Sequence, residues 1–487
     1  MGNLIILILT IAYYIVIVAI VIKILLENRK PIYSASLITM IVAIPIVGLI
    51  LFFFVGYKMN KSEFVSKKWH KDRREIEKWK TTMYDKISQK QQHEIHDPSK
   101  EWNKIIKMLY INDNAALTYY NDVELLINGE NTFPQIIEDL KNAKHHIHIE
   151  YYIFEQDEVG NEILNILFQK AKEGVKIRFI IDSFGSRAIN KKTFKLLKDN
   201  DIEVYSFLPL FTPKLFRYVN IRDHRKLILI DGRIAYTGGI NISKRYSNLE
   251  EYNNKRYWRD THIKITGDAV KSFELQFFNI WKFVSKQKED FFNEIFTCTE
   301  QITTNRVVTQ LVDSGPDSEY QSVLNFLQIA ITNAQKEILI QTPYFLPPEE
   351  LYSALVTSAL SGIKIKIMIP KVCDYKMVTY ASRSYLERLA NIGVEFYFYT
   401  KGFLHSKVFI FDDTLSSVGS TNFDFRSFFA NYELNAIFYS NKMNSKFKEM
   451  FEQDLLDCEK LIPSEWKKRP FPQKFAESFF RLFAPLL

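Results

Sequence analysis

Two long stretches without charged residues open the chain. The first is the apolar run from Leu4 to Ile22, and the second extends from Pro31 to Tyr57. An α-helix needs about 20 apolar residues to cross the roughly 30 Å hydrocarbon core of a bilayer, and both stretches are long enough. A cleaved signal peptide is the competing interpretation of the first stretch, but it has neither a preceding basic segment nor a following small-residue cleavage site. The pattern therefore predicts a two-helix transmembrane hairpin within residues 1–57.

Basic residues flank these stretches unevenly. The connection between them carries Lys23, Arg29 and Lys30, whereas the segment after them carries Lys58, Lys61, Lys67, Lys68, Lys71, Arg73 and Arg74. The more basic side of a membrane helix tends to stay in the cytoplasm. We therefore expect a multi-pass protein of the cell membrane whose main body is cytoplasmic. Residues 58–125 predict a charged juxtamembrane helix or linker.

The remainder of the chain alternates between strand-like and helix-like patterns, and the alternation occurs twice. The matching pieces are the strands within 143–154 and 334–345, the helices 162–173 and 350–361, and the strands that begin at Gly174 and Gly362. Strands that alternate with helices indicate an α/β layered fold. We expect two pseudo-symmetric α/β repeats, 126–300 and 301–487, packed face to face. The second would end in an amphipathic tail.

A short polar motif is repeated in the same two halves. Both copies read H-x-K-x-x-x-x-D, and each is followed at equal spacings by Gly, Asn and Arg. The residues are His224, Lys226, Asp231, Gly238, Asn241 and Arg245 in the first copy, and His405, Lys407, Asp412, Gly419, Asn422 and Arg426 in the second. Coincidence hardly explains two copies that share these trailing residues, so the chain carries a duplicated site.

These residue types suit the chemistry of a phosphate diester. Positions i and i+2 of a strand point to one face, so each His shares a surface with its Lys. One neutral imidazole can attack phosphorus and form a covalent intermediate. The other can protonate the departing alkoxide and then deprotonate the acceptor. Lysines, with Asn241 and Asn422, would hold the non-bridging oxygens, where charge accumulates.

The motif carboxylates have two interpretations. Asp231 and Asp412 are catalytic candidates by their place in the motif. However, Asp231-Gly232 separates the apolar runs 227–230 and 234–236, which is a strong hairpin-turn signal. Asp412 and Asp413 take the same place in the second copy. Either carboxylate could therefore be a structural residue that positions the strand next to the histidine.

With these motifs the chain resembles the phospholipase D superfamily and, within it, the bacterial cardiolipin synthases. The narrower resemblance rests on Tyr-Trp-Arg-Asp at 257–260, Gln-Thr-Pro-Tyr-Phe at 341–345 and Gly-Phe-Leu-His-Ser-Lys at 402–407. It spans essentially the whole chain, including the apolar amino-terminal stretches. It implies two phospholipase D-like α/β repeats behind a membrane hairpin.

The resemblance also implies roles for individual residues. His224 would be the nucleophile and His405 the general acid and base. Acidic residues downstream resemble the histidine-orienting carboxylates of the superfamily, so Glu433 would support His224 and Asp260 would support His405. The implied reaction transfers the phosphatidyl group of one phosphatidylglycerol through a phosphohistidine to a second, giving cardiolipin and glycerol. Phosphatidylglycerol and anionic membrane lipids are the expected partners.

Other functions use the same motifs. A phospholipase D-type hydrolase would pass the phosphatidyl group to water, and another phosphatidyltransferase would use a different alcohol. A non-enzymatic membrane scaffold predicts decayed motifs, whereas both copies here are complete. A nuclease-like enzyme would show a basic, aromatic-lined channel rather than a membrane hairpin, so we expect no nucleic-acid partner. The net charge of +8 fits an anionic membrane surface as well as it fits nucleic acid.

We expect no cofactor and no metal. One phosphodiester forms for each one broken, the chain has no G-x-x-x-x-G-K-[ST] loop, and cationic side chains surround the phosphate. Histidines 93 and 96, and the cluster His145, His146 and His148, look like metal ligands at first sight. A solvated helix face and a structural strand explain them better. The three cysteines, Cys298, Cys373 and Cys458, are too scattered for a disulfide framework.

Overall fold

The computed structural model describes residues 2–26, 31–43, 101–113, 115–208, 220–252, 254–287, 303 and 305–486. The chain divides into two compact units, and each is described by itself. One comprises residues 1–64 with 213–218, and the other comprises residues 65–212 with 219–487. The second unit contains all the described motif residues.

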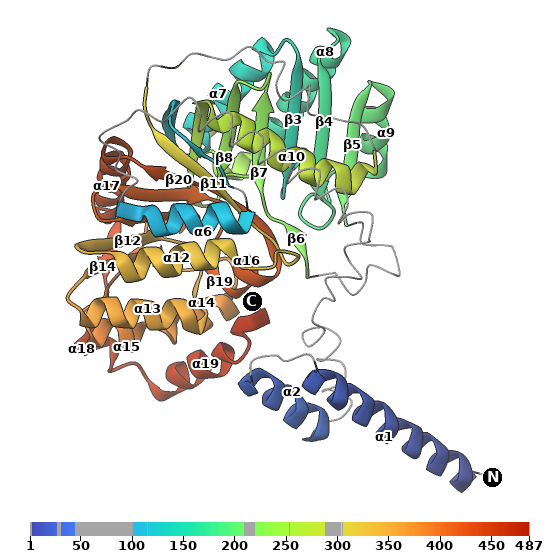
Figure 1. The fold of residues 1–487 in the computed structure, drawn as a ribbon, viewed down its shortest axis with the longest axis vertical. Helices are drawn as coiled ribbons and strands as arrows, with labels where there is room; N and C mark the ends of the chain where they lie inside the picture. The colour runs from blue at the N-terminus through green and yellow to red at the C-terminus, as the bar shows by residue number, and fades with distance from the viewer. Residues whose placement is uncertain are drawn as a thin grey trace. The chain divides into compact units, whose positions relative to one another are not determined.

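The first unit contains two helices, α1 (Gly2–Leu26) and α2 (Pro31–Ala43), drawn in blue in Figure 1. Ile17 and Ile24 of α1 pack with Leu37 and Ile41 of α2. Among the described residues, no helix combines the length and the apolar character that crossing a membrane requires. The transmembrane hairpin therefore stays a prediction, and residues 44–57 of its second helix lie outside the described part of the chain.

The first half of the second unit forms a 7-stranded sheet in the order β2-β10-β8-β7-β3-β4-β5. Its strands are β2 (Asn121–Ile127), β3 (His146–Tyr151), β4 (Lys176–Asp182), β5 (Ile202–Phe207), β7 (Lys226–Ile230), β8 (Ile234–Gly238) and β10 (Thr261–Gly267). β3, β4 and β5 are parallel, and β7 runs antiparallel to β3. β2 begins slightly before the predicted boundary of the repeat at residue 126.

Helices cover both faces of this sheet because successive side chains of a strand point to opposite faces. They are α7 (Asn128–Asn142), α8 (Glu158–Lys172), α9 (Lys191–Asp199) and α10 (Ala269–Ser285). Ile147 and Ile149 of β3 belong to the apolar core that contains buried residues of α7, α8 and α9. His146 and His148 of the same strand point to the other face, where α10 crosses the strands (Figure 1).

The second half builds a 10-stranded sheet in the order β1-β11-β20-β18-β17-β12-β14-β15-β21, with β6 also paired to β20. Its strands are β1 (Leu117–Thr118), β6 (Arg222–Asp223), β11 (Val308–Ser314), β12 (Glu337–Gln341), β14 (Lys364–Pro370), β15 (Glu395–Tyr399), β17 (Val408–Phe411), β18 (Leu415–Gly419), β20 (Asn431–Tyr439) and β21 (Cys458–Lys460). Smaller ladders join β13 (Phe345–Leu346) to β19 (Phe423–Asp424) and β9 (Tyr257–Arg259) to β16 (Gly402–Leu404).

The helices of this half are α6 (Asn103–Asp113), α12 (Ser322–Asn333), α13 (Glu349–Leu360), α14 (Lys376–Arg383), α15 (Leu386–Asn391), α16 (Phe425–Phe429), α17 (Asn441–Leu455), α18 (Pro463–Trp466) and α19 (Phe471–Arg481). Short 3-10 turns occur at 244–246, 250–252 and 484–486. α6, α12 and α13 lie side by side (Figure 1), and their buried residues share one apolar core with β12. The part of the predicted linker that the structure describes as α6 is therefore packed on the body.

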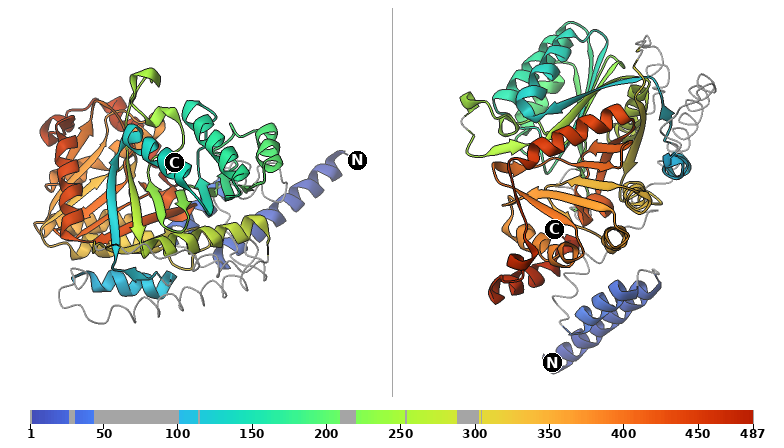
Figure 2. Two further views of the ribbon diagram at one scale, coloured as in Figure 1. Left: turned by 90° about the horizontal axis from the view of Figure 1, so that it is seen from above. Right: turned by 90° about the vertical axis from the view of Figure 1, so that its left-hand side faces the viewer.

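The internal repeat predicted from the sequence is confirmed by the strand order. β2-β10-β8-β7-β3-β4-β5 corresponds member by member to β11-β20-β18-β17-β12-β14-β15. α8 and α13 stand at the predicted helices, and β4 and β14 follow the predicted glycines. Strands β8 and β10 of the first sheet contact β18 of the second, so the two sheets meet directly (Figure 2).

Candidate active site

Each motif histidine lies just before a central strand, and the strand that leads to it pairs with the other half. β6 runs parallel to β20, with Asp223 beside Tyr432, and His224 N donates to Tyr432 O over 3.0 Å. β16 likewise runs parallel to β9, with Leu404 beside Arg259, and His405 N donates to Arg259 O over 2.7 Å. This pairing aligns His224 with Glu433, which follows Tyr432. It aligns His405 in the same way with Asp260, which follows Arg259.

Those following residues are the two carboxylates that the resemblance implied. Nδ1 of His224 lies 3.0 Å from both carboxylate oxygens of Glu433. Nδ1 of His405 lies 2.7 Å from Oδ2 of Asp260. The structure therefore shows the expected crossed contacts. Their physical cause is that the strand before each histidine pairs with a strand of the opposite half. With Nδ1 donating to a carboxylate, Nε2 of each ring keeps its lone pair for a reacting atom.

The motif lysines bring the two halves into one electrostatic site. Lys226 Nζ and Lys407 Nζ each donate to the carbonyl of the histidine two residues before, and Lys407 Nζ also lies 2.8 Å from Nδ1 of His405. Burial lowers the pKa of His224 to about 4, and the charges of Lys226 and Lys407 contribute. Burial and the charges of Lys407, Lys226 and His224 hold the pKa of His405 well below its usual value. Both rings are neutral near pH 7 before an anion binds.

The two motif lysines have unusually low pKa values. Burial lowers the pKa of Lys226 to about 7, although the charges of Glu433 and Asp260 partly oppose the shift. Burial likewise lowers the pKa of Lys407 to about 8, with Asp260 and Glu433 opposing it. An anion bound between the two ammonium groups would raise both pKa values, since an opposite charge favours the protonated form. The site thus favours negative charge.

The two supporting carboxylates are not equivalent. Burial raises the pKa of Asp260 to about 6, and Lys407 only partly offsets the shift. Burial acts in the same direction on Glu433, but the charges of His224 and Lys226 and the hydrogen bonds of His224 and Ser420 outweigh it, so the pKa of Glu433 falls below its usual value. Glu433 is therefore ionised throughout the neutral range, which fixes the tautomer of His224.

The two asparagines predicted to bind phosphate differ in their surroundings. Asn241 donates from Nδ2 to the Tyr246 hydroxyl over 2.5 Å, and its Oδ1 accepts from Ile153 N over 3.2 Å. Asn422 is also buried, but its Oδ1 has no hydrogen-bond partner among the described residues. The unpaired atom is an acceptor, so only the Nδ2 group of Asn422 could donate to a phosphate oxygen.

The catalytic assignment of Asp231 and Asp412 is not supported by their positions. Asp231 accepts from the backbone N–H groups of residues 144, 145 and 146 at 2.9, 2.7 and 3.0 Å. Asp412 accepts in the same way from residues 335, 336 and 337. Each lies at the end of its strand opposite to the motif histidine, and β7 alone spans about 16 Å at roughly 3.3 Å per residue.

These aspartates are structural turn residues, one of the two interpretations that the sequence left open. Both adopt left-handed backbone conformations, with φ of 54° at Asp231 and 50° at Asp412. Asp231 and Gly232 together form the turn of the predicted β7–β8 hairpin. The carboxylates tie that turn to the start of β3, and the equivalent turn to the start of β12.

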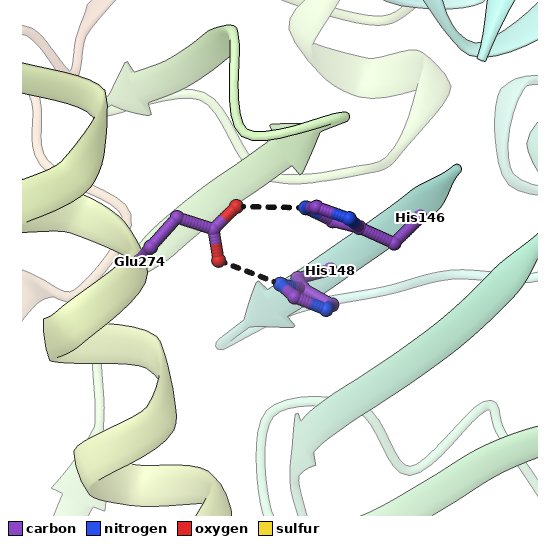
Figure 3. A group of neighbouring side chains, drawn as sticks. All are labelled: His146, His148 and Glu274. Carbon is purple, nitrogen blue, oxygen red and sulfur yellow. Dashed lines mark hydrogen bonds and ion pairs between the residues drawn. The ribbon is translucent and has the colours of Figure 1, made fainter. Parts of the chain in front are cut away.

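Figure 3 shows the one His/Glu cluster in the described residues with metal-ligand geometry, formed by His146, His148 and Glu274. Glu274 holds His146 Nε2 at 3.1 Å and His148 Nδ1 at 2.8 Å, and an Arg178 nitrogen lies 2.9 Å from the other nitrogen of His148. Burial raises the pKa of Glu274, but the two histidines outweigh it and lower the pKa to about 2. Both carboxylate oxygens of Glu274 and both ring nitrogens of His148 are thus engaged within the protein, so the network fits a structural role.

Several other sequence candidates fall elsewhere. Histidines 93 and 96 and Cys298 lie outside the described part of the chain. Cys373 and Cys458 are free. The carboxyl-terminal α19 is partly packed, because Phe480 stacks on Tyr380 with ring centroids 5.7 Å apart. Its other aromatic side chains form an exposed ridge, with Phe471 77% and Phe475 61% exposed.

Sequence reasoning missed the aromatic and hydroxyl groups around the histidines. The ring of Tyr152 contacts that of His224 edge-on, with centroids 4.9 Å apart. Tyr246 and Trp258 contact the ring of His405 in the same manner. Ser420 donates to Glu433 over 2.5 Å. Tyr152 was visible only as a member of the repeated strand segment, and Trp258 only within the Tyr-Trp-Arg-Asp segment at 257–260. Neither Tyr246 nor Ser420 stands in a motif.

Comparison with known proteins agrees with this geometry. The family described as "Cardiolipin synthase, PLD-like domain" matches residues 136–281 and 327–455. A cardiolipin synthase of Geobacillus sp. (strain WCH70) is 35% identical over 95% of this chain and 90% of its own length. One from Alkalihalophilus pseudofirmus is 34% identical over 98% of this chain and 94% of its own length.

A solved structure shares the fold. The crystal structure of phosphatidylserine synthase from Haemophilus influenzae Rd KW20 superposes with a TM-score of 0.59 at 18% identity. The match covers 79% of this chain and 100% of that chain. At this identity the likeness concerns the fold alone, and it supports the mixed α/β, phospholipase D-like architecture.

Proposed function

Because the chain belongs to the cardiolipin synthase family with a phospholipase D-like domain, we propose that it joins two phosphatidylglycerol molecules into cardiolipin and releases glycerol. The observation that carries the proposal is the pair of crossed histidine–carboxylate contacts, one from each half, in a buried site with two lysines. A single phosphodiester needs a nucleophile, an acid and cations around one phosphorus, and this site supplies all of them.

His224 is the proposed nucleophile. Its low pKa keeps the ring neutral, and the ionised Glu433 holds the proton on Nδ1, so Nε2 faces the substrate with a lone pair. Attack of Nε2 on the phosphorus of the first lipid forms a P–N bond and breaks the P–O bond to glycerol. Lys226, Lys407 and Asn422 would stabilise the charge on the non-bridging oxygens.

His405 is the proposed general acid and base. Negative charge of the bound phosphate raises its pKa, so the ring can take up a proton and give it to the departing glycerol oxygen. The same ring then removes the proton from the free hydroxyl of the second phosphatidylglycerol. That oxygen attacks phosphorus, the P–N bond breaks, and cardiolipin forms. Asp260 would orient the ring in both steps.

Incubation of the purified, detergent-solubilised protein with phosphatidylglycerol alone tests the proposal. Cardiolipin and glycerol in equal amounts are expected. Phosphatidic acid with glycerol would instead indicate a hydrolase that uses water as the acceptor, and no turnover would contradict both functions.

We also propose that the protein is anchored in the cell membrane by the apolar stretches 4–22 and 31–57, with its catalytic body in the cytoplasm. Exposed apolar side chains on α1, among them Leu4, Ile15 and Leu26, support this. The ridge of α19 with Phe471 and Phe475 would add an interfacial contact. The full chain should stay in the membrane pellet after washing with alkaline carbonate, which removes peripheral proteins. Release into the supernatant would contradict the anchor.

The rate should depend on pH with a bell-shaped profile of kcat/KM. As pH falls through about 6, Asp260 takes up a proton and loses the charge that orients His405. As pH rises through about 7 and 8, Lys226 and then Lys407 lose the charges that bind phosphate. Because bound phosphate raises the lysine pKa values, the alkaline limb of kcat should lie at higher pH than that of kcat/KM.

Initial rates measured from pH 5 to 9 check this profile. Asp260→Asn, which cannot ionise, should lower the rate and remove the acid limb. A wild-type kcat/KM that stays constant between pH 6 and pH 8 would contradict the assignment of these groups.

A further inference from the structure

His262, in β10, is a buried histidine that the proposed mechanism does not use. Its side chain is shielded from solvent, and neither ring nitrogen has a hydrogen-bond partner among the described residues. Burial lowers the pKa of His262 to about 3, while the charge of Asp260 opposes the shift and that of Lys226 adds to it. The ring is therefore neutral near pH 7 and carries one donor and one acceptor. A buried polar group without a partner costs stability, so its presence calls for an explanation.

The second repeat shows what the equivalent residue does. Asn435 lies in β20, which corresponds to β10, and both residues stand two positions after a supporting carboxylate. Oδ1 of Asn435 accepts from the Thr421 hydroxyl over 2.6 Å. Nδ2 of Asn435 donates to the Ser417 hydroxyl over 3.2 Å. The asparagine therefore has a structural role in its sheet.

The first repeat lacks the partners of that asparagine. Thr421 and Ser417 stand two residues after and two residues before the motif glycine, and in the first repeat these places hold Ile240 and Tyr236. Ile240 has no polar side chain, and the hydroxyl of Tyr236 donates to Asp139 instead. The histidine thus stands at the same place in the sheet without the same structural role.

Strand register brings the histidine to the motif lysine of its own repeat. β10 pairs with β8 so that His262 lies opposite Gly238. β7 pairs with the other edge of β8, with Leu227 opposite Thr237, so that Lys226 comes opposite the same glycine. Residues in one such row share a face of the sheet, and neighbouring strands lie only about 4.8 Å apart. A Cβ at Gly238 would lie 2.6 Å from Nδ1 of His262, so the ring packs against the residue that separates it from Lys226.

The buried ammonium group of Lys226 can use another acceptor. It has three N–H donors, and the hydrogen bond described for it is to the carbonyl of His224. A buried cation stays charged only where other groups replace the water that it has lost. A neutral imidazole can do so without adding a second charge.

We propose that His262 is a positioning residue that acts through Lys226. Its neutral ring accepts a hydrogen bond from the ammonium group, directly or through one buried water, and so stabilises the charge that holds the phosphate. This inference rests on the proposed function and deepens it, because it assigns a third histidine to the binding of the reacting group.

His262→Leu removes the acceptor and tests the inference through the pH dependence of kcat/KM. Loss of one hydrogen bond to a charged group should move the alkaline limb set by Lys226, near pH 7, about one pH unit lower. The loss of rate relative to wild type should therefore grow with pH, from about twofold at pH 6 through about fivefold at pH 7 to about ninefold at pH 8. The other charged groups that act on the lysine stay in place, namely Glu433, Lys407, Asp260 and Asp223.

Two further variants accompany this one. His262→Asn puts an amide oxygen near the place of Nδ1, so it should recover most of the rate at pH 8. His145→Leu makes the same change as the test variant at an exposed histidine outside the site, and it should keep the wild-type profile. Thermal unfolding checks the fold, and leucine at 262 should not lower the stability because it replaces an unpaired polar group. If that variant does unfold, His262→Met takes its place, since methionine adapts to irregular space.

The pH dependence separates the possible results. An equal loss at all three pH values would overturn the inference, because a structural defect does not follow the charge of a lysine. A loss that is largest at pH 6 would also overturn it, since it would follow the protonation of Asp260. Full activity of His262→Leu at pH 8 would do the same. A wild-type protein that makes no cardiolipin would instead refute the proposed function itself.

Discussion

Substitution of His224 by alanine is expected to lower the rate of cardiolipin formation by at least about 10⁴-fold, as loss of a nucleophile does in other covalent enzymes. The other ring of this site with a carboxylate partner, His405, is assigned to proton transfer and cannot replace the nucleophile in the same step. Glu433 is not left unpaired by the substitution, because Ser420 and Asn431 both donate to it. The body of the protein should therefore remain folded.

The measurement is cardiolipin released per enzyme from phosphatidylglycerol, with circular dichroism as the check on folding. His145→Ala is the matched control, since His145 is an exposed histidine outside the site. It should keep full activity. Normal product formation by His224→Ala would overturn the assignment of the nucleophile, whereas loss of activity with loss of the fold would indicate that the ring is needed for stability.

The architecture was predictable because both repeats carry long, periodic signals. Buried strands such as β4 and β14 follow glycines at equivalent positions, and amphipathic helices α8 and α13 precede them. The pairing of the two halves was not predictable in this way. β6, β9 and β16 contain only two or three residues each, too few to show a period.

The active site was accessible to sequence reasoning only where a motif repeats. His224, His405 and their lysines stand in matching positions, and the crossed carboxylates came from the resemblance. The place of Asp231 within the motif suggested a catalytic role, whereas the hairpin signal suggested a turn. The structure agrees with the turn, because β7 separates Asp231 from His224. Tyr152 and Ser420 reach the site through tertiary packing, for which the sequence has no local pattern.

His405→Asn should separate the two halves of the reaction. Asparagine cannot donate a proton to glycerol or remove one from an acceptor, so the rate with phosphatidylglycerol should fall by roughly 10²- to 10⁴-fold. A phosphatidyl ester with a nitrophenol leaving group needs little protonation, so His224 should still attack it. The second step still lacks its base, and phosphoenzyme should accumulate.

A rapid release of about one nitrophenolate per enzyme, followed by slow turnover, is the expected signature of such an intermediate. The adduct itself can be identified as an acid-labile P–N bond on the peptide that contains His224. The double variant His224→Ala, His405→Asn should show no rapid release. If His405→Asn forms no adduct with the activated ester, its ring does not act as the base, and the division of roles between the two histidines must be reversed or abandoned.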